Sequence, residues 1–391
     1  MKRLKHALSI AATLAAVASA ASAQTVSDAL TFLVTNQSVP TGDFQRDQSA
    51  AQATSQTISR AILANLATLP VATSSSGFLY RLNPELGTVE RATQSFGPFF
   101  VERALTAGRH RASLGLTFQQ LRFESLDGRK LRDGSLVTTA NQFVDEAAPF
   151  DVDRLTLNID ARVATLYGNV GVADRMEVGF AVPMVDLSLD GTRANTYRGR
   201  TFTQASATAH SIGFADIVAR TKVTMYSEDG AGLAAAVDVR LPTGRREDLL
   251  GAGRTSMKVS AIGSIERGKL STHVNAGVSV GGLARELSYG AAIAAAATPR
   301  LTVIGEALGR WIDGAGHIQT VAAAHPTLRQ VETIRLVPDQ SGLNMITFVP
   351  GLKWNLSDTW VLAGNVSMPL TTGGLTTRFT PFVGVDYAVG R

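Results

Sequence analysis

The sequence ADIVARTKVTM, residues 215–225, decides the fold. Small or apolar residues occupy every second position from Ala215 to Met225, and Asp216, Arg220 and Lys222 lie between them. Side chains of a β-strand point alternately to its two faces. One face of this strand is therefore apolar and the other carries charge. Such a strand suits either a soluble sandwich that hides its apolar face or an outer-membrane barrel that turns this face to lipid.

The same alternation recurs over the rest of the chain and predicts about twelve strands. Many of them have ten residues or more, whereas strands of soluble proteins usually have about five or six and a tilted membrane-spanning strand needs about nine to eleven. The predicted strands cover residues 111–124, 154–170, 176–189, 213–226, 232–242, 255–266, 269–281, 286–297, 301–312, 343–356, 359–369 and 376–389.

The connections between these strands alternate between short and long. The short ones span residues 173–175, 228–231, 267–268, 298–300 and 357–358, and the longest of the others span 125–153, 190–212, 242–254 and 313–342. Short periplasmic turns opposite longer external loops are typical of outer-membrane barrels. We therefore predict an all-β fold, a transmembrane antiparallel up-and-down β-barrel of about twelve strands over residues 110–391.

The first residues predict export from the cytoplasm. Three cations, Lys2, Arg3 and Lys5, precede an apolar run over about 7–18, and Ala21-Ser22-Ala23 resembles a cleavage site. This order is typical of a secretory signal peptide over residues 1–23; the alternative, a membrane anchor, is disfavoured because the run is short. Together with the strands, it predicts a location in the outer membrane of a Gram-negative bacterium.

Residues 24–109 have a different pattern. Asp43 or Asp47 can begin a helix that runs to about Leu69, where Pro70 ends it. An ordinary packed helix and a membrane-surface helix are both open. We expect this segment to be a helical plug, or hatch, in the barrel.

Composition excludes several classes of site. The chain has no Cys, so thiolate metal sites and Cys nucleophiles are excluded. The formal charge of +5 falls to +2 once the three signal-peptide cations are removed, and no basic run predicts nucleic acid as a partner. No His and carboxylate set has metal spacing, so we expect neither a metal nor a cofactor.

Two stretches resemble a known family. They are Gly213-Phe214-Ala215-Asp216-Ile217-Val218 and the run from Val239-Arg240-Leu241-Pro242-Thr243-Gly244 through Glu247-Asp248-Leu249-Leu250-Gly251-Ala252-Gly253, followed by His273-Val274-Asn275-Ala276-Gly277 and Thr298-Pro299-Arg300-Leu301. They are similar to the outer-membrane proteins named for the meta-pathway of phenol degradation. The resemblance covers about Arg111 to the C-terminus. It implies a barrel that passes small hydrophobic compounds, distantly like the long-chain fatty-acid transporters with their N-terminal hatch.

The polar face of the predicted strands supplies charges to the lumen. Both signs are interleaved, which favours a paired network that stiffens the wall and holds the plug; an eyelet that selects solutes by charge is the alternative. The predicted lumen charges are Asp160, Arg162, Glu177, Asp216, Arg220, Lys222, Asp238, Arg240, Lys258, Glu266, Glu306, Arg310, Lys353, Arg378 and Asp386.

The function we expect is passive uptake of a small hydrophobic solute, possible substrates being aromatic or fatty-acid-like, with no catalysis. An aromatic cluster before the barrel supplies the candidates for the solute path: Phe78, Tyr80, Phe96, Phe99 and Phe100. The expected partners are outer-membrane lipid and lipopolysaccharide, the solute and the barrel-assembly machinery, around a monomeric barrel.

Two alternatives stay open. One is a structural or adhesive barrel whose long loops, above all residues 313–341, bind an external partner. The other is an outer-membrane hydrolase, for which His273 beside Ser271 and Asn275 is the nominee.

Overall fold

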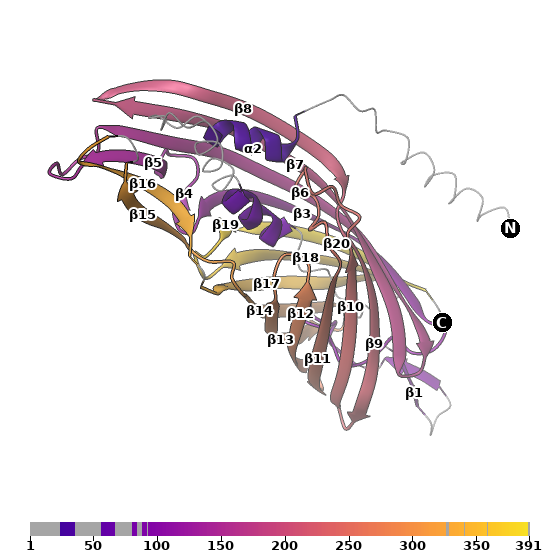
Figure 1. Ribbon diagram of the computed structural model, residues 1–391. Coiled ribbons are helices and arrows are strands. Elements are labelled where there is room, and N and C mark those ends of the chain that lie inside the picture. Colours follow the sequence, from indigo (N-terminus) through magenta and orange to yellow (C-terminus); the bar gives the residue numbers. More distant parts are fainter. Residues whose placement is uncertain are drawn as a thin grey trace, which may run out of the picture.

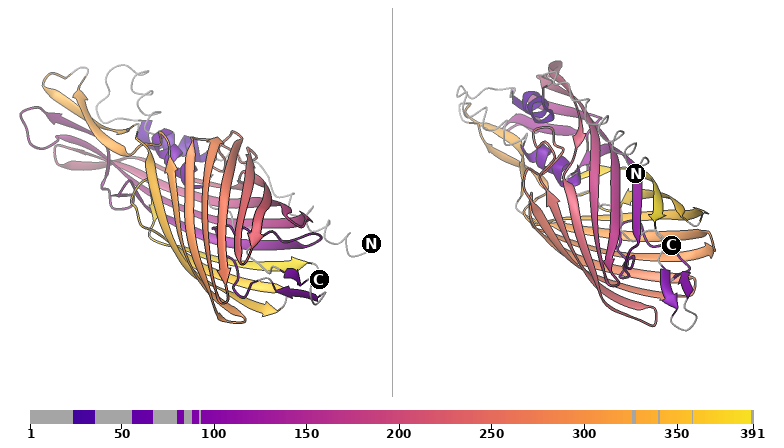
Figure 2. Two further views of the ribbon diagram at one scale, coloured as in Figure 1. Left: turned by 90° about the horizontal axis from the view of Figure 1, so that it is seen from below. Right: turned by 90° about the vertical axis from the view of Figure 1, so that its right-hand side faces the viewer.

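Twelve long strands close into one antiparallel barrel in the computed structural model, which describes residues 24–35, 56–66, 80–83, 88–91, 93–325, 328–339, 341–357 and 359–389 (Figures 1 and 2). The last strand pairs with the first, with Val385 opposite Leu116. In order around the barrel they are β3 (Ala112–Leu126), β6 (Asp151–Ala173), β7 (Met176–Tyr197), β9 (Ile217–Glu228), β10 (Ala231–Leu241), β11 (Ser256–Arg267), β12 (Leu270–Gly281), β13 (Glu286–Thr298), β14 (Leu301–Ile312), β17 (Leu343–Ser357), β18 (Trp360–Pro369) and β20 (Thr380–Val389). The predicted fold class and strand number are confirmed.

The outer face of the barrel is apolar. On β10, Leu233, Val237 and Leu241 are exposed on the outside, whereas Ala236 and Asp238 are buried inside. Trp354 and Trp360 are exposed beside the turn at residues 357–359, where Trp360 packs on Tyr387 with ring centroids 4.7 Å apart. An apolar outer band with aromatic residues at its rim is the surface that a bilayer requires of a barrel.

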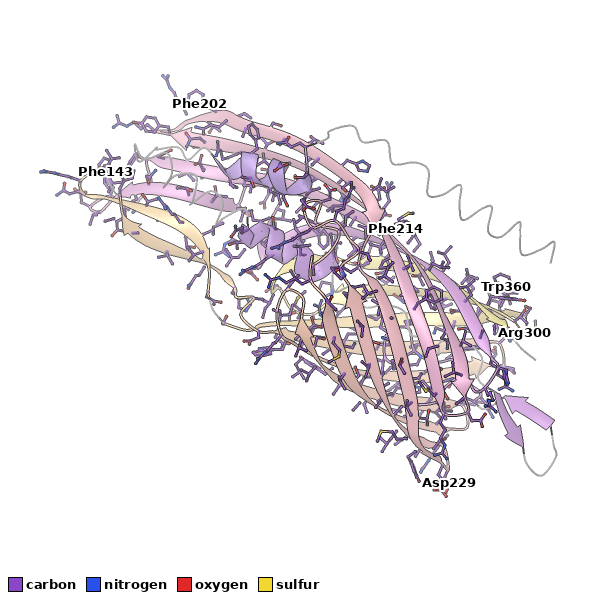
Figure 3. The ribbon with its side chains drawn as sticks, turned by 45° about the vertical axis from the view of Figure 1, so that its right-hand side comes forward. Phe143, Phe202, Phe214, Asp229, Arg300 and Trp360 are labelled. Carbon is purple, nitrogen blue, oxygen red and sulfur yellow. The ribbon has the colours of Figure 1, made fainter. Side chains whose placement is uncertain are left out.

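The two ends of the barrel differ. Asp229, Arg300 and Trp360 lie at the turn end, where the connections are short, and Phe143 and Phe202 lie at the opposite loop end (Figure 3). No helix in the described part of the chain has the length and apolar character needed to cross a membrane.

One side of the barrel continues far beyond the loop end as a raised wall (Figure 2). It consists of the upper parts of β6 and β7 with β5 (Leu136–Phe143), β8 (Arg200–Phe214), β15 (Ile318–Ala324) and β16 (Val331–Pro338), and β16 pairs with β5. Two short strands, β4 (Arg129–Lys130) and β19 (Leu375–Thr377), pair with the loop-end residues of β3 in the same region. Three predicted long loops therefore contain strands that the sequence analysis missed.

Two of the predicted lumen charges are wrong. Asp160 and Arg162 lie on the outer face of β6, with side chains 43% and 64% exposed, and pair with Arg122 at 3.8 Å and Asp186 at 3.7 Å. The cause is a reversal of polarity along one strand. From about residue 163 to residue 155, toward the loop end, the inward residues of β6 are apolar and buried and the outward ones are mostly polar, because the raised wall leaves the membrane there.

Two N-terminal helices cover the apolar inner face of the raised wall (Figure 1). Helix α2 (Val26–Thr35) lies against β7 and β8, and buries Leu30 and Leu33. The second helix includes residues 56–66 and buries Ile58 and Ile62. The helices thus sit at the loop end, and residues 93–107 of the same N-terminal segment lie in the lumen without helical structure.

Other predicted N-terminal features fall outside the described residues. They are the signal peptide over 1–23, the helix start at Asp43 or Asp47 and the helix end at Leu69. The hairpin β1 (Tyr80–Asn83) and β2 (Thr88–Arg91) lies near the turn end (Figure 1).

Candidate functional site: a luminal segment and the cavity above it

A non-helical stretch, residues 93–107, crosses the lumen of the barrel; we call it the luminal segment. Phe96, Phe99, Val101, Arg103 and Ala104 are all buried in it. Its first residues bond to the barrel strands at the turn end, where the Ser95 and Ser271 hydroxyls lie 2.8 Å apart. Its downstream end returns to the same rim, where Ala107 N–H donates to Glu177 at 2.8 Å, before the chain enters β3. The segment therefore closes the lumen as a loop.

One carboxylate of β14 holds the top of this loop. Glu306 accepts hydrogen bonds from three consecutive backbone N–H groups, those of Phe99, Phe100 (3.0 Å) and Val101 (3.1 Å). Glu306 is fully buried. A buried carboxylate is tolerated only when it is satisfied in this way, so the luminal segment and Glu306 depend on each other.

A network of charges binds the downstream half of the segment. Lys222 on β9 lies 3.4 Å from Glu102 and 2.9 Å from Glu177, and it donates to the carbonyl of Arg103 at 3.1 Å. Arg220 pairs with both Glu102 and Asp238. The wall and the segment thus neutralise each other's charges, as the paired-network interpretation predicts.

Two further contacts tie the segment to the wall. Lys353 donates to the carbonyl of Pro98 at 2.7 Å and lies 5.0 Å from the centre of the Phe99 ring. Arg103 lies 3.1 Å from Glu266. Polar contacts of this kind can be exchanged for contacts with water.

Three of the predicted aromatic residues lie in the lumen, and two of them meet there. Phe99 and Phe100 both contact Phe382 edge to face, with centroids 6.0 and 5.5 Å apart, and Phe96 is buried nearer the turn end, where its N–H donates to Thr302. Tyr80 lies instead in the β1–β2 hairpin, and Phe78 falls outside the described residues. Phe382 of β20 is not among the residues selected from the sequence, because nothing in the sequence placed it opposite the luminal segment.

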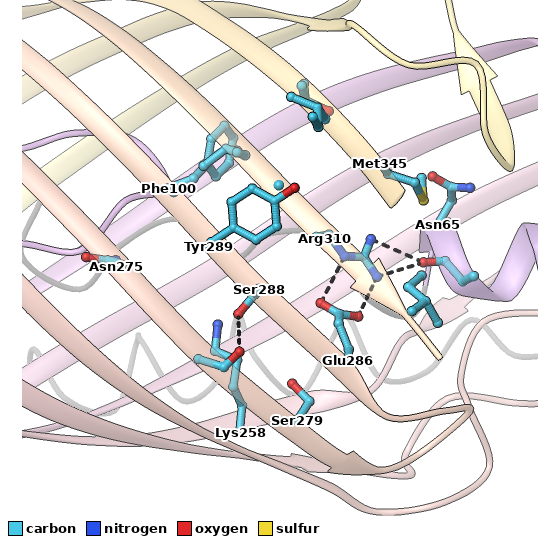
Figure 4. Close-up of a pocket in the computed structure, with 18 of the residues that line it drawn as sticks. Asn65, Phe100, Lys258, Asn275, Ser279, Glu286, Ser288, Tyr289, Arg310 and Met345 are labelled. Atoms are coloured by element: carbon cyan, nitrogen blue, oxygen red, sulfur yellow. Dashed lines mark hydrogen bonds and ion pairs between the residues drawn. The ribbon is translucent and has the colours of Figure 1, made fainter. Parts of the chain in front are cut away.

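A cavity of about 300 Å³ lies above the luminal segment (Figure 4). Phe100, Val101 and Glu102 form part of its floor, and Ala64 and Asn65 of the second helix line it from the loop end. Arg310 connects the helix to the wall, because it pairs with Glu286 at 2.7 Å and donates to the carbonyl of Ala64 at 3.3 Å. The cavity is thus bounded by the helix on one side and the luminal segment on the other.

Seven of the charges assigned to the lumen from the sequence lie on the inner face around the luminal segment and the cavity. They are Asp216, Arg220, Lys222, Asp238, Arg240, Glu306 and Arg310. They do not form one ring: Lys222 and Glu306 hold the luminal segment, Arg220 and Asp238 bridge it to the cavity, and Arg240 and Arg310 line the cavity.

Asp216 has a structural task that explains the motif around it. Its carboxylate accepts from the N–H groups of Gly244 (3.0 Å) and Ala252 (2.8 Å), and Gly251 approaches it so closely that a Cβ there would collide. These bonds fold the loop over residues 242–254 inward, and Leu249 and Leu250 join the core under α2. Asp216 thus joins residues 213–218 to the 242–254 loop, so the two stretches that resemble the family lie against each other.

The nominated hydrolase set is not assembled. The Nδ1 atom of His273 lies 2.8 Å from the Ser264 hydroxyl, and Ser271 bonds to Ser95 instead. The imidazole is fully buried, so it is inaccessible to a lipid or peptide substrate in this arrangement. The described residues contain no group of three or more His, Asp or Glu able to hold a metal ion.

Comparison with known proteins gives structural likenesses only. No protein-family model matches the sequence, and no curated protein sequence matches it. An outer-membrane channel from Pseudomonas putida F1 is 13% identical, with a TM-score of 0.47 over 73% of this chain and 98% of that one.

Two other solved structures are still less similar. The NanC porin is 6% identical, with a TM-score of 0.35 over 69% of this chain and 98% of that one. The translocator domain of the autotransporter NalP from Neisseria meningitidis is 10% identical, with a TM-score of 0.37 over 72% and 88%. At scores this low, the likenesses say nothing about what crosses this barrel.

Proposed function

We propose that this chain is an outer-membrane channel for small hydrophobic solutes, and that the luminal segment is its gate. The observation that carries the proposal is the luminal segment itself. It closes a membrane-spanning barrel through polar contacts with the wall, and a solute-sized cavity lies directly above it. A purely structural barrel requires neither an exchangeable seal nor a cavity.

The polarity of the lumen suits such a route. Phe100 and Leu308 give the cavity apolar surface, and Phe99 and Phe382 continue it below the floor. A solute that enters at the loop end meets apolar and aromatic surface until the luminal segment moves aside. The loop end then faces the outside of the cell, and the turn end faces the periplasm, as expected of outer-membrane barrels.

A disulfide lock tests this function in the full chain. Because the Ser95 and Ser271 hydroxyls lie 2.8 Å apart and the chain has no Cys, the double variant Ser95→Cys/Ser271→Cys is placed to form one disulfide. It pins the upstream end of the luminal segment, whose downstream end already continues into β3. Flux of phenol into proteoliposomes, after subtraction of the flux into protein-free liposomes, is measured before and after reduction.

The expected result is blocked flux in the oxidised variant and restored flux after reduction. The single variant Ser271→Cys is the control and should conduct in both conditions. Equal flux in the locked and reduced double variant refutes the gate, and no flux in any form, including the unmodified chain, refutes the channel.

The raised wall supports one other candidate, an adhesive barrel. Phe202 is exposed on it, far from the membrane-spanning band, and Val144 is exposed directly after β5. Removal of the β15–β16 hairpin separates the two functions, because adhesion would fall while solute flux persists.

A further inference from the structure

The charges around the cavity do not balance. Four cations line it, Arg220, Arg240, Lys258 and Arg310, against three carboxylates, Glu102, Asp238 and Glu286. Every one of the three carboxylates has a cationic partner: Glu102 and Asp238 pair with Arg220, and Glu286 pairs with Arg310. Lys258 also lies 3.7 Å from Asp238. The surplus positive charge is Arg240.

Arg240 makes no hydrogen bond or ion pair with any residue in the described part of the chain. It is half-buried on β10, between Val218 of β9 and Ser256 of β11 in the strand register. Asp216, the other inward carboxylate near the loop end of β9, is already occupied by two backbone N–H groups. A guanidinium has five N–H donors and stays charged at any physiological pH, so Arg240 presents unused donors to the cavity.

The surroundings of Arg240 are divided into a polar and an apolar side. Small residues and hydroxyls form the wall beside it: Ser256, Ser260, Gly277, Ser279, Gly281 and Ser288. Bulky apolar side chains lie in the remainder of the lining, together with hydroxyl and amide side chains such as Gln119, Thr347 and Thr380; the apolar ones are Phe100, Leu121, Phe123, Val218, Leu308 and Ile312. A ligand with one charged end and one apolar body fits this division.

Volume limits the size of that ligand. The cavity of about 300 Å³ is at the lower end of the range for small-molecule sites and equals the liquid volume of about ten water molecules. A single-ring acid fits this space, whereas a long acyl chain does not.

We propose that the cavity binds a small single-ring carboxylic acid as its anion, with the carboxylate on Arg240 and the ring against the apolar side. Arginine is suited to this because its planar fork donates two parallel hydrogen bonds to a carboxylate. The inference rests on the proposed channel function and names its substrate class: Arg240 would select the anion before the luminal segment opens.

Benzoate and its neutral analogue benzamide test the proposal, because they share ring and size and differ in charge. Binding of each to the detergent-solubilised full chain is measured by titration calorimetry at pH 7, and flux of each is measured in proteoliposomes. The variants are Arg240→Met, Arg240→Lys and, as control, Arg245→Met on the exposed part of the 242–254 loop. Heat-modifiable electrophoretic mobility shows that each barrel is folded.

The unmodified chain should bind benzoate roughly tenfold or more tightly than benzamide. Arg240→Met should weaken benzoate binding roughly 10- to 100-fold, the range expected when a hydrogen-bonded charge loses its partner, and leave benzamide binding unchanged. Arg240→Lys should fall between the two because a lysine keeps the charge without the fork.

Equal affinity of the unmodified chain for benzoate and benzamide overturns the inference, even if Arg240→Met fails to fold. Unchanged benzoate affinity in a folded Arg240→Met variant also overturns it. In both cases flux of benzamide into proteoliposomes in excess of that into protein-free liposomes keeps the channel function standing. Absence of flux for both compounds refutes the channel function itself.

Discussion

Replacement of Glu306 by Gln should open the channel. Glu306 accepts from three N–H groups of the luminal segment, those of Phe99, Phe100 and Val101. A glutamine keeps one carbonyl oxygen, which accepts at most two of these N–H groups, and turns its own NH₂ toward the third. The negative charge that strengthens all three bonds is also lost.

The magnitude follows from these contacts. A hydrogen bond to a charged group contributes about 1.5–3 kcal/mol, so the loss of one bond and the weakening of two should destabilise the closed state by about 3 kcal/mol. Since about 1.4 kcal/mol corresponds to a factor of ten, the ratio of open to closed channels should rise about a hundredfold. The open state loses little, because Glu306 would then be hydrated.

Single-channel recording in a planar bilayer measures this ratio as the fraction of time spent in the high-conductance state. Glu286→Gln is the matched control, because Glu286, like Glu306, is an inward carboxylate. Glu286 pairs with Arg310 and makes no contact with the luminal segment. An unchanged open fraction in Glu306→Gln would refute the reasoning, and so would an equal rise in Glu286→Gln, since loss of luminal charge alone would then explain the opening.

Three further outcomes are expected. Val237→Arg, on the lipid face of β10, should lower the free energy of unfolding of the barrel by roughly 2–4 kcal/mol, as measured by urea titration. Ser260→Arg, which faces the cavity, should lower it less. Equal losses would contradict the assignment of the two faces. Asp216→Ala removes the carboxylate that accepts from the N–H groups of Gly244 and Ala252. Because two hydrogen bonds to a charged group are lost, trypsin should cut after Arg245 or Arg246 at least about tenfold faster. An unchanged rate of cleavage would mean that contacts other than those of Asp216 hold the loop. In intact cells, a membrane-impermeant maleimide should label Phe202→Cys but not Asp229→Cys, and the reverse pattern would invert the topology (Figure 3).

The sequence was sufficient for the barrel because each membrane-spanning strand obeys a strict local rule. Period-two alternation, as in Val237 against Asp238, identifies both the strand and its two faces. The short turns then gave the direction of every strand. The raised wall was less predictable, because β6 crosses from lipid to water within one unbroken strand and its polarity reverses between Arg162 and Ala164. The prediction assumed that the polar residues of β6 point inward along the whole strand, and it therefore misplaced Asp160 and Arg162.

The candidate site was predicted only in its composition. Alternation placed Arg220, Lys222 and Glu306 in the lumen, but the partner of each charge depends on contacts between residues far apart in the sequence, such as Glu102 with Lys222. The luminal segment has no periodic pattern, because its backbone bonds to side chains of the wall and not to a neighbouring strand. The lack of a partner for Arg240 depends on how every nearby carboxylate is paired in the folded barrel, and no local sequence pattern determines those pairs.

The attachment of the luminal segment has a consequence for the speed of closing. Its downstream end is fastened at the turn end, where His110 N–H donates to Gly171 at 3.1 Å and the Gly171 N–H donates to Arg111 at 2.8 Å, directly before β3 begins. A displaced segment therefore remains tethered within a few residues of its own binding site, and its return is an intramolecular event with an effective concentration in the millimolar range. Each opening should be brief and self-terminating, independent of how many copies the membrane holds.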